Sequence, residues 1–326
     1  MRKLIFVSAS LILAGIVWLS WSPQPAVALM SDYRDRLART TQTDIPLELP
    51  NPVRLLTERE QRLSPLPEAR TSLGKALGLG ECGLVPELAR VNNSLGKVAA
   101  ASTQLLQTQR ILALATPCQP DHSALQDSLD ELIQHRRQLW PHLLNNTLIA
   151  SPEWEEHFKS STPALAPNAT IDTALEGLLG WMGQQRPNQP KDPDRLIEWL
   201  GRLKDSDQGA AVLNAQRLIE GTLPAMTQAL RDTPICMGPG TAEQRKLAQQ
   251  VFASQYLGRV QPWLAKVERG LRPVYQASPM LAELSGIERQ WLATDQTLTS
   301  FQEQIKAHAL AWRDLLERCG VSPSSR

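Results

Sequence analysis

The sequence lacks the motifs by which most metal and catalytic sites are recognised. Its five histidines form no His-Glu-x-x-His, no Cys-x-x-Cys occurs, and the Glu-x-x-His spacing of di-iron bundles is missing. No basic block is present and the net charge is +1 at pH 7, so the chain offers no electrostatic surface for nucleic acid. We therefore expect no cofactor, no metal site and no nucleic-acid partner.

Long hydrophobic runs are also scarce, and the single one lies at the N-terminus. Met1-Arg2-Lys3 precede the apolar residues 4–21, prolines follow, and Ala26-Val27-Ala28 forms a small-x-small processing site. This layout is typical of an export signal, but the run is also long enough to cross a bilayer if it is not cleaved. Residues 1–28 are therefore predicted to be a signal peptide or an N-terminal membrane anchor. The rest of the chain is predicted to lie in the periplasm, either released or held at the inner membrane through residues 4–21.

The composition after this leader is that of an ordinary globular protein. Cleavage after Ala28 removes Arg2 and Lys3 from the 34 basic residues, and the remaining 32 nearly balance 33 acidic ones. The hydrophobic share of 42% is sufficient for a real core. No cysteine lies in or just after the apolar run, so a lipid-attachment site of the bacterial lipoprotein kind is missing.

The periodicity of apolar residues predicts an all-α fold, because helical spacing recurs and alternating strand patterns do not. We expect an elongated bundle of about eight to ten helices. The clearest pattern runs from Ile287 through Trp291, Thr294 and Trp312 to Cys319 and predicts a helix of about 35 residues near the C-terminus. A second stripe predicts a helix over 241–274, with a turn at Ala277-Ser278-Pro279. Together these form a long antiparallel hairpin over 241–318.

Proline-rich stretches suggest how the rest of the chain is divided. Residues 29–150 are predicted to form an N-terminal helical lobe that contains the proline-rich segment 44–66. Residues 168–319 are predicted to form a C-terminal helical lobe, and 320–326 a flexible tail. One continuous bundle fits the same pattern.

Four cysteines in an exported chain suggest two disulfides, for which three connectivities exist. Cys236 lies just before the proposed hairpin and Cys319 just after it. Helices of about 34 residues at 1.5 Å per residue bring both cysteines to the same open end, so Cys236–Cys319 is the first expectation. The alternative is that all four are free, buried thiols.

The remaining pair, Cys82–Cys118, depends on a break in the chain between them. A four-three pattern from Leu84 to Leu112 would, as one unbroken helix, hold these cysteines about 50 Å apart, too far for a bond. Asn and Gly are turn residues, so we favour a break around Asn92-Asn93-Ser94-Leu95-Gly96, which allows the bond.

One local coincidence resembles catalytic chemistry. Ser-Leu-Gly-Lys occurs at Ser72–Lys75 and again at Ser94–Lys97, and Ser-x-x-Lys places an amine one helical turn from a hydroxyl, as in penicillin-recognising acyltransferases. The companion Ser-Asp-Asn and Lys-Thr-Gly elements of those enzymes are missing. Ser94 and Lys97 are therefore weak catalytic candidates, and a structural turn or helix start is the expected role.

The segment around these residues resembles a known bacterial family. The carriers of the resemblance are Gly80-Glu81-Cys82-Gly83-Leu84, the block Asn92 to Val98, the stretch Gln104 to Arg110, and Cys118. They are similar to the family called domain of unknown function 3080. The resemblance implies an exported envelope protein with a helical body and supplies no catalytic residue. It also marks Asn92, Asn93, Ser94, Gly96 and Lys97 as candidates for a binding surface.

The sequence thus predicts an exported cell-envelope protein that acts as a non-catalytic binding or scaffolding module. Its expected partner is an unknown envelope protein or envelope component. The alternative is a serine hydrolase or acyltransferase that acts on envelope material through Ser94 and Lys97.

Overall fold

The computed structural model describes residues 24–51, 53–67, 79–189, 192–237 and 241–321. Throughout these ranges the regular secondary structure is helical and no strand occurs, which confirms the all-α prediction. Two isolated β-bridges, Leu56 with Leu292 and Arg186 with Gln189, are the extended pairings in the described part. Residues 4–21, the apolar run of the predicted leader, lie outside it, whereas Pro25 to Ala28 at the end of that leader belong to the first helix. Within the described part, no helix has both the length and the hydropathy needed to cross a bilayer.

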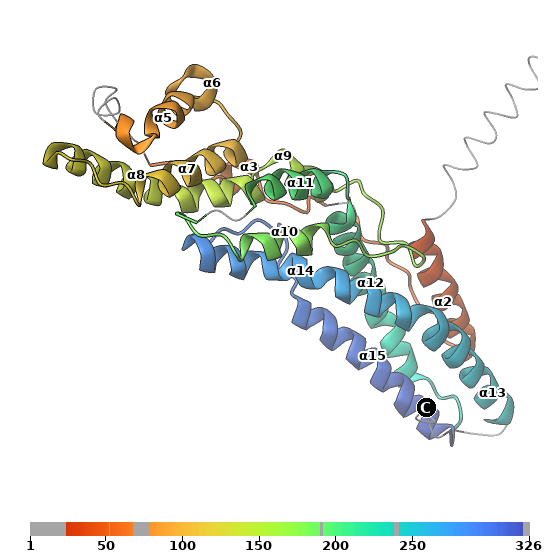
Figure 1. Cartoon of the computed structure of the whole chain (residues 1–326). Coiled ribbons are helices and arrows are strands. Elements are labelled where there is room, and N and C mark those ends of the chain that lie inside the picture. Colours follow the sequence, from red (N-terminus) through yellow and green to blue (C-terminus); the bar gives the residue numbers. More distant parts are fainter. Residues whose placement is uncertain (1–23, 52, 68–78, 190–191, 238–240, 322–326) are drawn as a thin grey trace, which may run out of the picture.

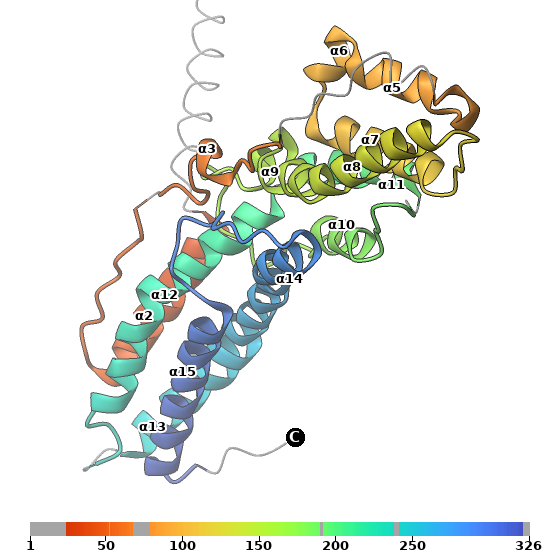
Figure 2. The same ribbon diagram turned by 90° about the vertical axis from the view of Figure 1, so that its left-hand side faces the viewer.

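The larger body of the molecule is a bundle of long helices that lie side by side (Figures 1 and 2). The chain enters it with α2 (Pro25–Thr41) and returns much later with α12 (Gln208–Asp232), α13 (Thr241–Val251), the π-helix η2 (Phe252–Val260), α14 (Gln261–Ser285) and α15 (Leu298–Arg318). Helix α2 packs on α12, α13 and η2. Residues from both ends of the sequence therefore share one core, which extends from Ala26 to Cys319.

A second group of helices extends from one end of this bundle. The helices α7 (Ala101–Ala115) and α8 (Ser123–Ile149) form an antiparallel pair, and η1 (Gly80–Cys82), α5 (Leu84–Asn92) and α6 (Ser94–Lys97) lie above them (Figures 1 and 2). The outer part has its own small core, formed by Leu79, Cys82, Leu84, Leu88, Ile111, Ala115, Leu129 and Leu132. Residues 29–150 thus contribute to two separate cores.

Short helices join the two groups. Helices α9 (Pro152–His157), α10 (Ala174–Met182) and α11 (Pro193–Lys204) pack between α7 and α8 on one side and α12 and α14 on the other, while α3 (Arg59–Arg62) lies in the proline-rich segment. Helices α5, α6 and α7 are separate, as the favoured break near Asn93 requires.

The C-terminal hairpin differs from the prediction in the position of its turn. Helix α14 continues through Pro273 and Pro279 to Ser285, and Gly286 then ends it in the left-handed conformation with φ of 65°. Helix α15 begins only at Leu298, where Thr297 and Ser300 form a capping box. The expected 35-residue helix is therefore wrong: Trp291 lies in an extended segment that pairs with the strand-like residues Leu55–Thr57.

Candidate functional site

The predicted binding surface lies on the turn between α5 and α6, and two of its residues build that turn. The Asn93 side chain caps α6 and accepts a hydrogen bond from the Gly96 amide at 2.6 Å, a standard N-cap arrangement. A Cβ atom at position 96 would lie 2.1 Å from the carbonyl oxygen of Arg90 and 2.7 Å from that of Val91. Since no side chain fits in that space, glycine is required here. Asn93 and Gly96 are therefore occupied in making the turn.

The side chains exposed by this turn are the apolar ones beside them. Leu95 is 77% exposed and Val98 is 80% exposed, the highest values among the large hydrophobic residues of the described part. Asn92 ends α5 and is half-buried, and Ser94 is exposed. We call Leu95 and Val98 the apolar tip. Exposed aliphatic side chains at neighbouring positions of one turn can form part of a contact surface when a partner covers them.

Ser94 lacks the surroundings of an activated nucleophile among the described residues. Its hydroxyl has no hydrogen bond to a described residue, and the amide of Gly96 already donates to Asn93. Lys97 ends α6, but its side chain lies outside the described atoms. The second Ser-Leu-Gly-Lys copy, Ser72–Lys75, falls in residues that the structure does not describe. Among the described side chains, none forms a hydrogen bond through which it could act as a base for Ser94.

Both predicted cysteine pairs lie at disulfide distance. The Cα atoms of Cys82 and Cys118 are 5.6 Å apart, and those of Cys236 and Cys319 are 5.1 Å apart. The first bond ties η1 to the end of α7 inside the small outer core. It thereby fixes the base from which α5 and α6 present the apolar tip. The second ties the end of α15 to the segment between α12 and α13.

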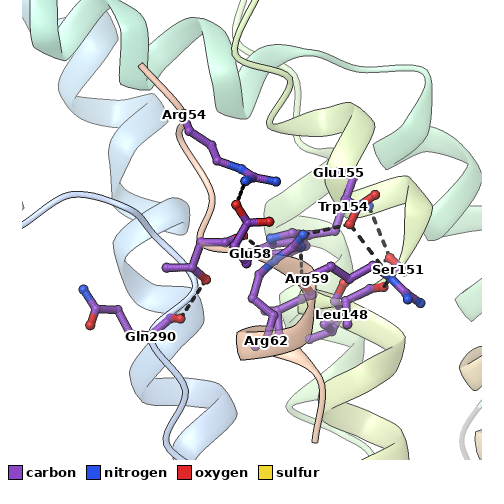
Figure 3. Close-up of polar contacts among 12 residues, drawn as sticks. Arg54, Glu58, Arg59, Arg62, Leu148, Ser151, Trp154, Glu155 and Gln290 are labelled. Carbon is purple, nitrogen blue, oxygen red and sulfur yellow. Dashed lines mark hydrogen bonds and ion pairs between the residues drawn. The ribbon is translucent and has the colours of Figure 1, made fainter.

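A polar junction that the sequence did not reveal joins the outer helices to the bundle (Figure 3). Arg62 is 2% exposed. Its guanidinium donates to the carbonyl oxygens of Thr57 and Ile149 and pairs with the Glu155 carboxylate at 2.7 Å. Burial of an arginine requires such partners. The side chain therefore fastens the α3 segment to the end of α8 and to α9.

Asn146 extends this junction by pairing with backbone. Its Oδ1 accepts from the Ser64 amide at 2.7 Å, and its Nδ2 donates to the Ser64 carbonyl at 2.8 Å. The Ser64 hydroxyl lies 2.7 Å from His142 Nδ1. A nearby aromatic cluster of Trp154, Phe158 and Trp291, with ring centroids 4.9–5.1 Å apart, covers the same region. The glycosylation-like triplet at Asn145-Asn146-Thr147 is accordingly buried and structural.

The centre of the bundle holds a fully buried histidine, His308. Its Nε2 lies 2.6 Å from the Tyr33 hydroxyl and its Nδ1 lies 2.8 Å from the Thr227 hydroxyl. Trp312 Nε1 donates to Tyr33, and Thr227 donates to the Leu223 carbonyl. The Thr227 hydroxyl hydrogen is used by the Leu223 carbonyl, so Thr227 must accept a hydrogen bond from His308 Nδ1–H. The neutral ring then has a bare Nε2, which accepts a hydrogen bond from the Tyr33 hydroxyl. Burial lowers the pKa of His308 to about 3.

These contacts describe a helical structure with a braced, exposed tip, and the family comparison agrees with the sequence resemblance. The model of a family described as a protein of unknown function, DUF3080, matches residues 30–323. The chain belongs to the DUF3080 family. No curated protein and no solved structure matches it. Because the match continues far beyond the N-terminal block that carries the resemblance, the DUF3080 region includes the small outer core, the large core apart from Ala26 and Leu29, and both cysteine pairs.

The members of the predicted surface thus have different roles in this DUF3080 protein. Asn93 and Gly96 shape the turn, Ser94 is exposed on it, and Asn92 ends the preceding helix. Leu95 and Val98, which the sequence did not single out, carry the exposed surface. The order Asn-Ser-Leu-Gly could have indicated the turn itself, since Asn is a favoured N-cap residue and Gly a favoured turn residue.

Proposed function

We propose that this protein is an exported binding or scaffolding module of the bacterial cell envelope, and that it contacts a protein partner through the apolar tip, Leu95 and Val98. The supporting observation is the construction of the turn: a cap, an obligatory glycine and a nearby disulfide hold two aliphatic side chains in solvent. Exposing them costs hydrophobic free energy that a partner surface would recover.

Two further observations support export to the periplasm. Paired cysteines are typical of oxidising compartments, and no free cysteine occurs in the described residues. The family match begins at residue 30, just beyond Ala28 of the proposed processing site. Cleavage there would remove Pro25 to Ala28 from the first turn of α2, including the buried Ala26 and the partly buried Val27, whereas Leu29, Met30 and Tyr33 belong to the part of α2 that remains. Each buried methyl group that is lost costs about 1 kcal/mol.

Photo-crosslinking in cells tests the proposed contact. A photo-reactive amino acid is placed at Val98, with Ile197 on α11 as the matched control, because Ile197 is also an exposed aliphatic residue at 53%. We expect a discrete covalent adduct from position 98 that is lost when Leu95→Ser is added, and none from position 197. The same adducts from both positions, or none from position 98, would contradict the proposal.

The same cells test the proposed location in the periplasm and the hydrolase alternative. Fractionation should recover the protein with the periplasm, with a mature N-terminus at Leu29 and without titratable thiols. A fluorophosphonate probe should leave Ser94 unlabelled. Labelling that disappears in Ser94→Ala would instead favour the serine hydrolase and overturn the non-catalytic module.

A further inference from the structure

A cavity of about 480 Å³ lies on the side of the molecule where three distant parts of the chain meet. Its wall is formed by Arg137, Trp140 and Pro141 of α8, by residues 185–187 after α10, and by residues 283–286 at the end of α14. A second hollow of about 460 Å³ continues along α8 and shares Arg137 with it. Volumes of this order are usual for sites that bind small ligands.

Two buried hydrogen-bond donors, one in the wall of this cavity and one on the same helix one turn earlier, have no partner among the described residues. Trp140 is 4% exposed, and its indole Nε1 is buried with no hydrogen-bond partner among the described residues. One helical turn earlier, Arg136 is 7% exposed; its Nε has no partner, and no described carboxylate pairs with it. Burial lowers the pKa of Arg136 to about 10. An unpaired buried donor is costly, so two of them on one helix face indicate a missing acceptor.

The charge at the cavity is positive. Arg137 is exposed and forms no ion pair with a described residue, and Arg186 is directed by bonds to the carbonyls of Gly183 and Gln185 rather than by an acid. Glu283 is the acid in the lining. Arg137, Arg186 and the neighbouring Arg136 together outnumber this single acid. Arginine binds carboxylates through paired hydrogen bonds.

The remaining wall favours a peptide over an inorganic anion. The indole of Trp140 and the rings of Pro141 and Pro187 provide an apolar surface. The last carbonyls of α14, at Leu284 and Ser285, belong to a helix end whose carbonyls lack intrahelical donors. A peptide terminus combines what these groups accept: a carboxylate, amide N–H donors and an apolar side chain.

We infer that this cavity binds the C-terminal end of a peptide, with the terminal carboxylate at Arg137 and Arg186 and the preceding residue against Trp140. The inference concerns a different face from the apolar tip and does not depend on the contact proposed there. Each can therefore fail without the other.

Equilibrium dialysis with mass spectrometry tests this inference on the purified, oxidised protein. The probes are one pool of N-acetylated tripeptides with free C-termini and the same pool as C-terminal amides, which differ only in the carboxylate. The variants are Arg137→Gln and Arg186→Gln, both at exposed positions. Arg313→Gln is the control, since Arg313 is an exposed arginine on α15 paired with Asp314.

We expect retention of free-acid peptides over the matching amides, with affinity about tenfold weaker in either cavity variant and unchanged in Arg313→Gln. Equal retention of acids and amides would show that no carboxylate is recognised. Retention that survives both cavity substitutions would place binding elsewhere, and no retention of any probe would show that the cavity does not take peptide ends. Each of these three results overturns the inference.

Discussion

Lowering the pH should destabilise this protein through His308. The ordinary pKa of histidine is about 6.5, whereas burial lowers the pKa of His308 to about 3. Between these values the unfolded chain binds a proton that the folded chain rejects, so stability is complete above pH 6.5 and falls as the pH drops towards 3. From the two pKa values, the loss between pH 7 and pH 5 is about 2 kcal/mol, and it approaches about 5 kcal/mol below pH 3.

The neutral variant His308→Gln provides the comparison, because an amide keeps one donor and one acceptor for Thr227 and Tyr33 but does not titrate. Urea unfolding followed by tryptophan fluorescence at pH 7 and pH 5 gives the free energy of unfolding for both proteins. The variant should be less stable at pH 7 and should lose about 2 kcal/mol less on acidification. Burial also lowers the pKa of His157, but that contribution is present in both proteins and cancels. Equal losses in the two proteins would refute the reasoning.

Three further predictions concern the tip, the junction and the cross-link. Gly96→Ala should lower the free energy of unfolding by about 1–3 kcal/mol, because the new methyl group would overlap a backbone carbonyl. It should also accelerate amide hydrogen exchange in α5 and α6, and unchanged exchange would contradict the steric argument. Arg62→Met should cost about 2–3 kcal/mol in urea unfolding because two carbonyls lose their donor, whereas the exposed control Arg59→Met should cost less than about 1 kcal/mol; similar losses would count against the junction. Replacing Cys82 and Cys118 by serine should lower the free energy of unfolding by about 4 kcal/mol on the chain-entropy model. Proteases should then cleave first within the small outer core. A loss near zero would mean that the disulfide does not stabilise that core.

Much of the helical content could be read from the sequence because amphipathic helices repeat their apolar residues every three or four positions. The C-terminal turn could not. Trp291 and Thr294 continue the four-three spacing by coincidence, but the backbone of residues 291–293 pairs with Leu55–Thr57, some 235 residues earlier in the chain. Local periodicity carries no information on such a distant partner.

The cysteine pairing followed from hairpin geometry although the turn was misplaced, and the lengths explain why. The helix from Thr241 to Ser285 is about 67 Å long, whereas α15, with 21 residues, covers only about 32 Å. The extended residues 286–297 can span up to about 40 Å, which covers the difference. Cys319 therefore returns to the level of Cys236 wherever the chain reverses, so the prediction depended on the total length and not on the position of the turn.

The residues named from the sequence as a binding surface could not be separated by role without coordinates, and this affects how the surface must be tested. Asn93 and Gly96 are already used by the fold, so their substitution would disturb the turn and weaken any contact indirectly. Leu95 and Val98 make few contacts within the chain, since about four fifths of each side chain is in solvent. A substitution there changes the surface and spares the scaffold, so the proposed contact depends on the two apolar residues that the motif surrounds.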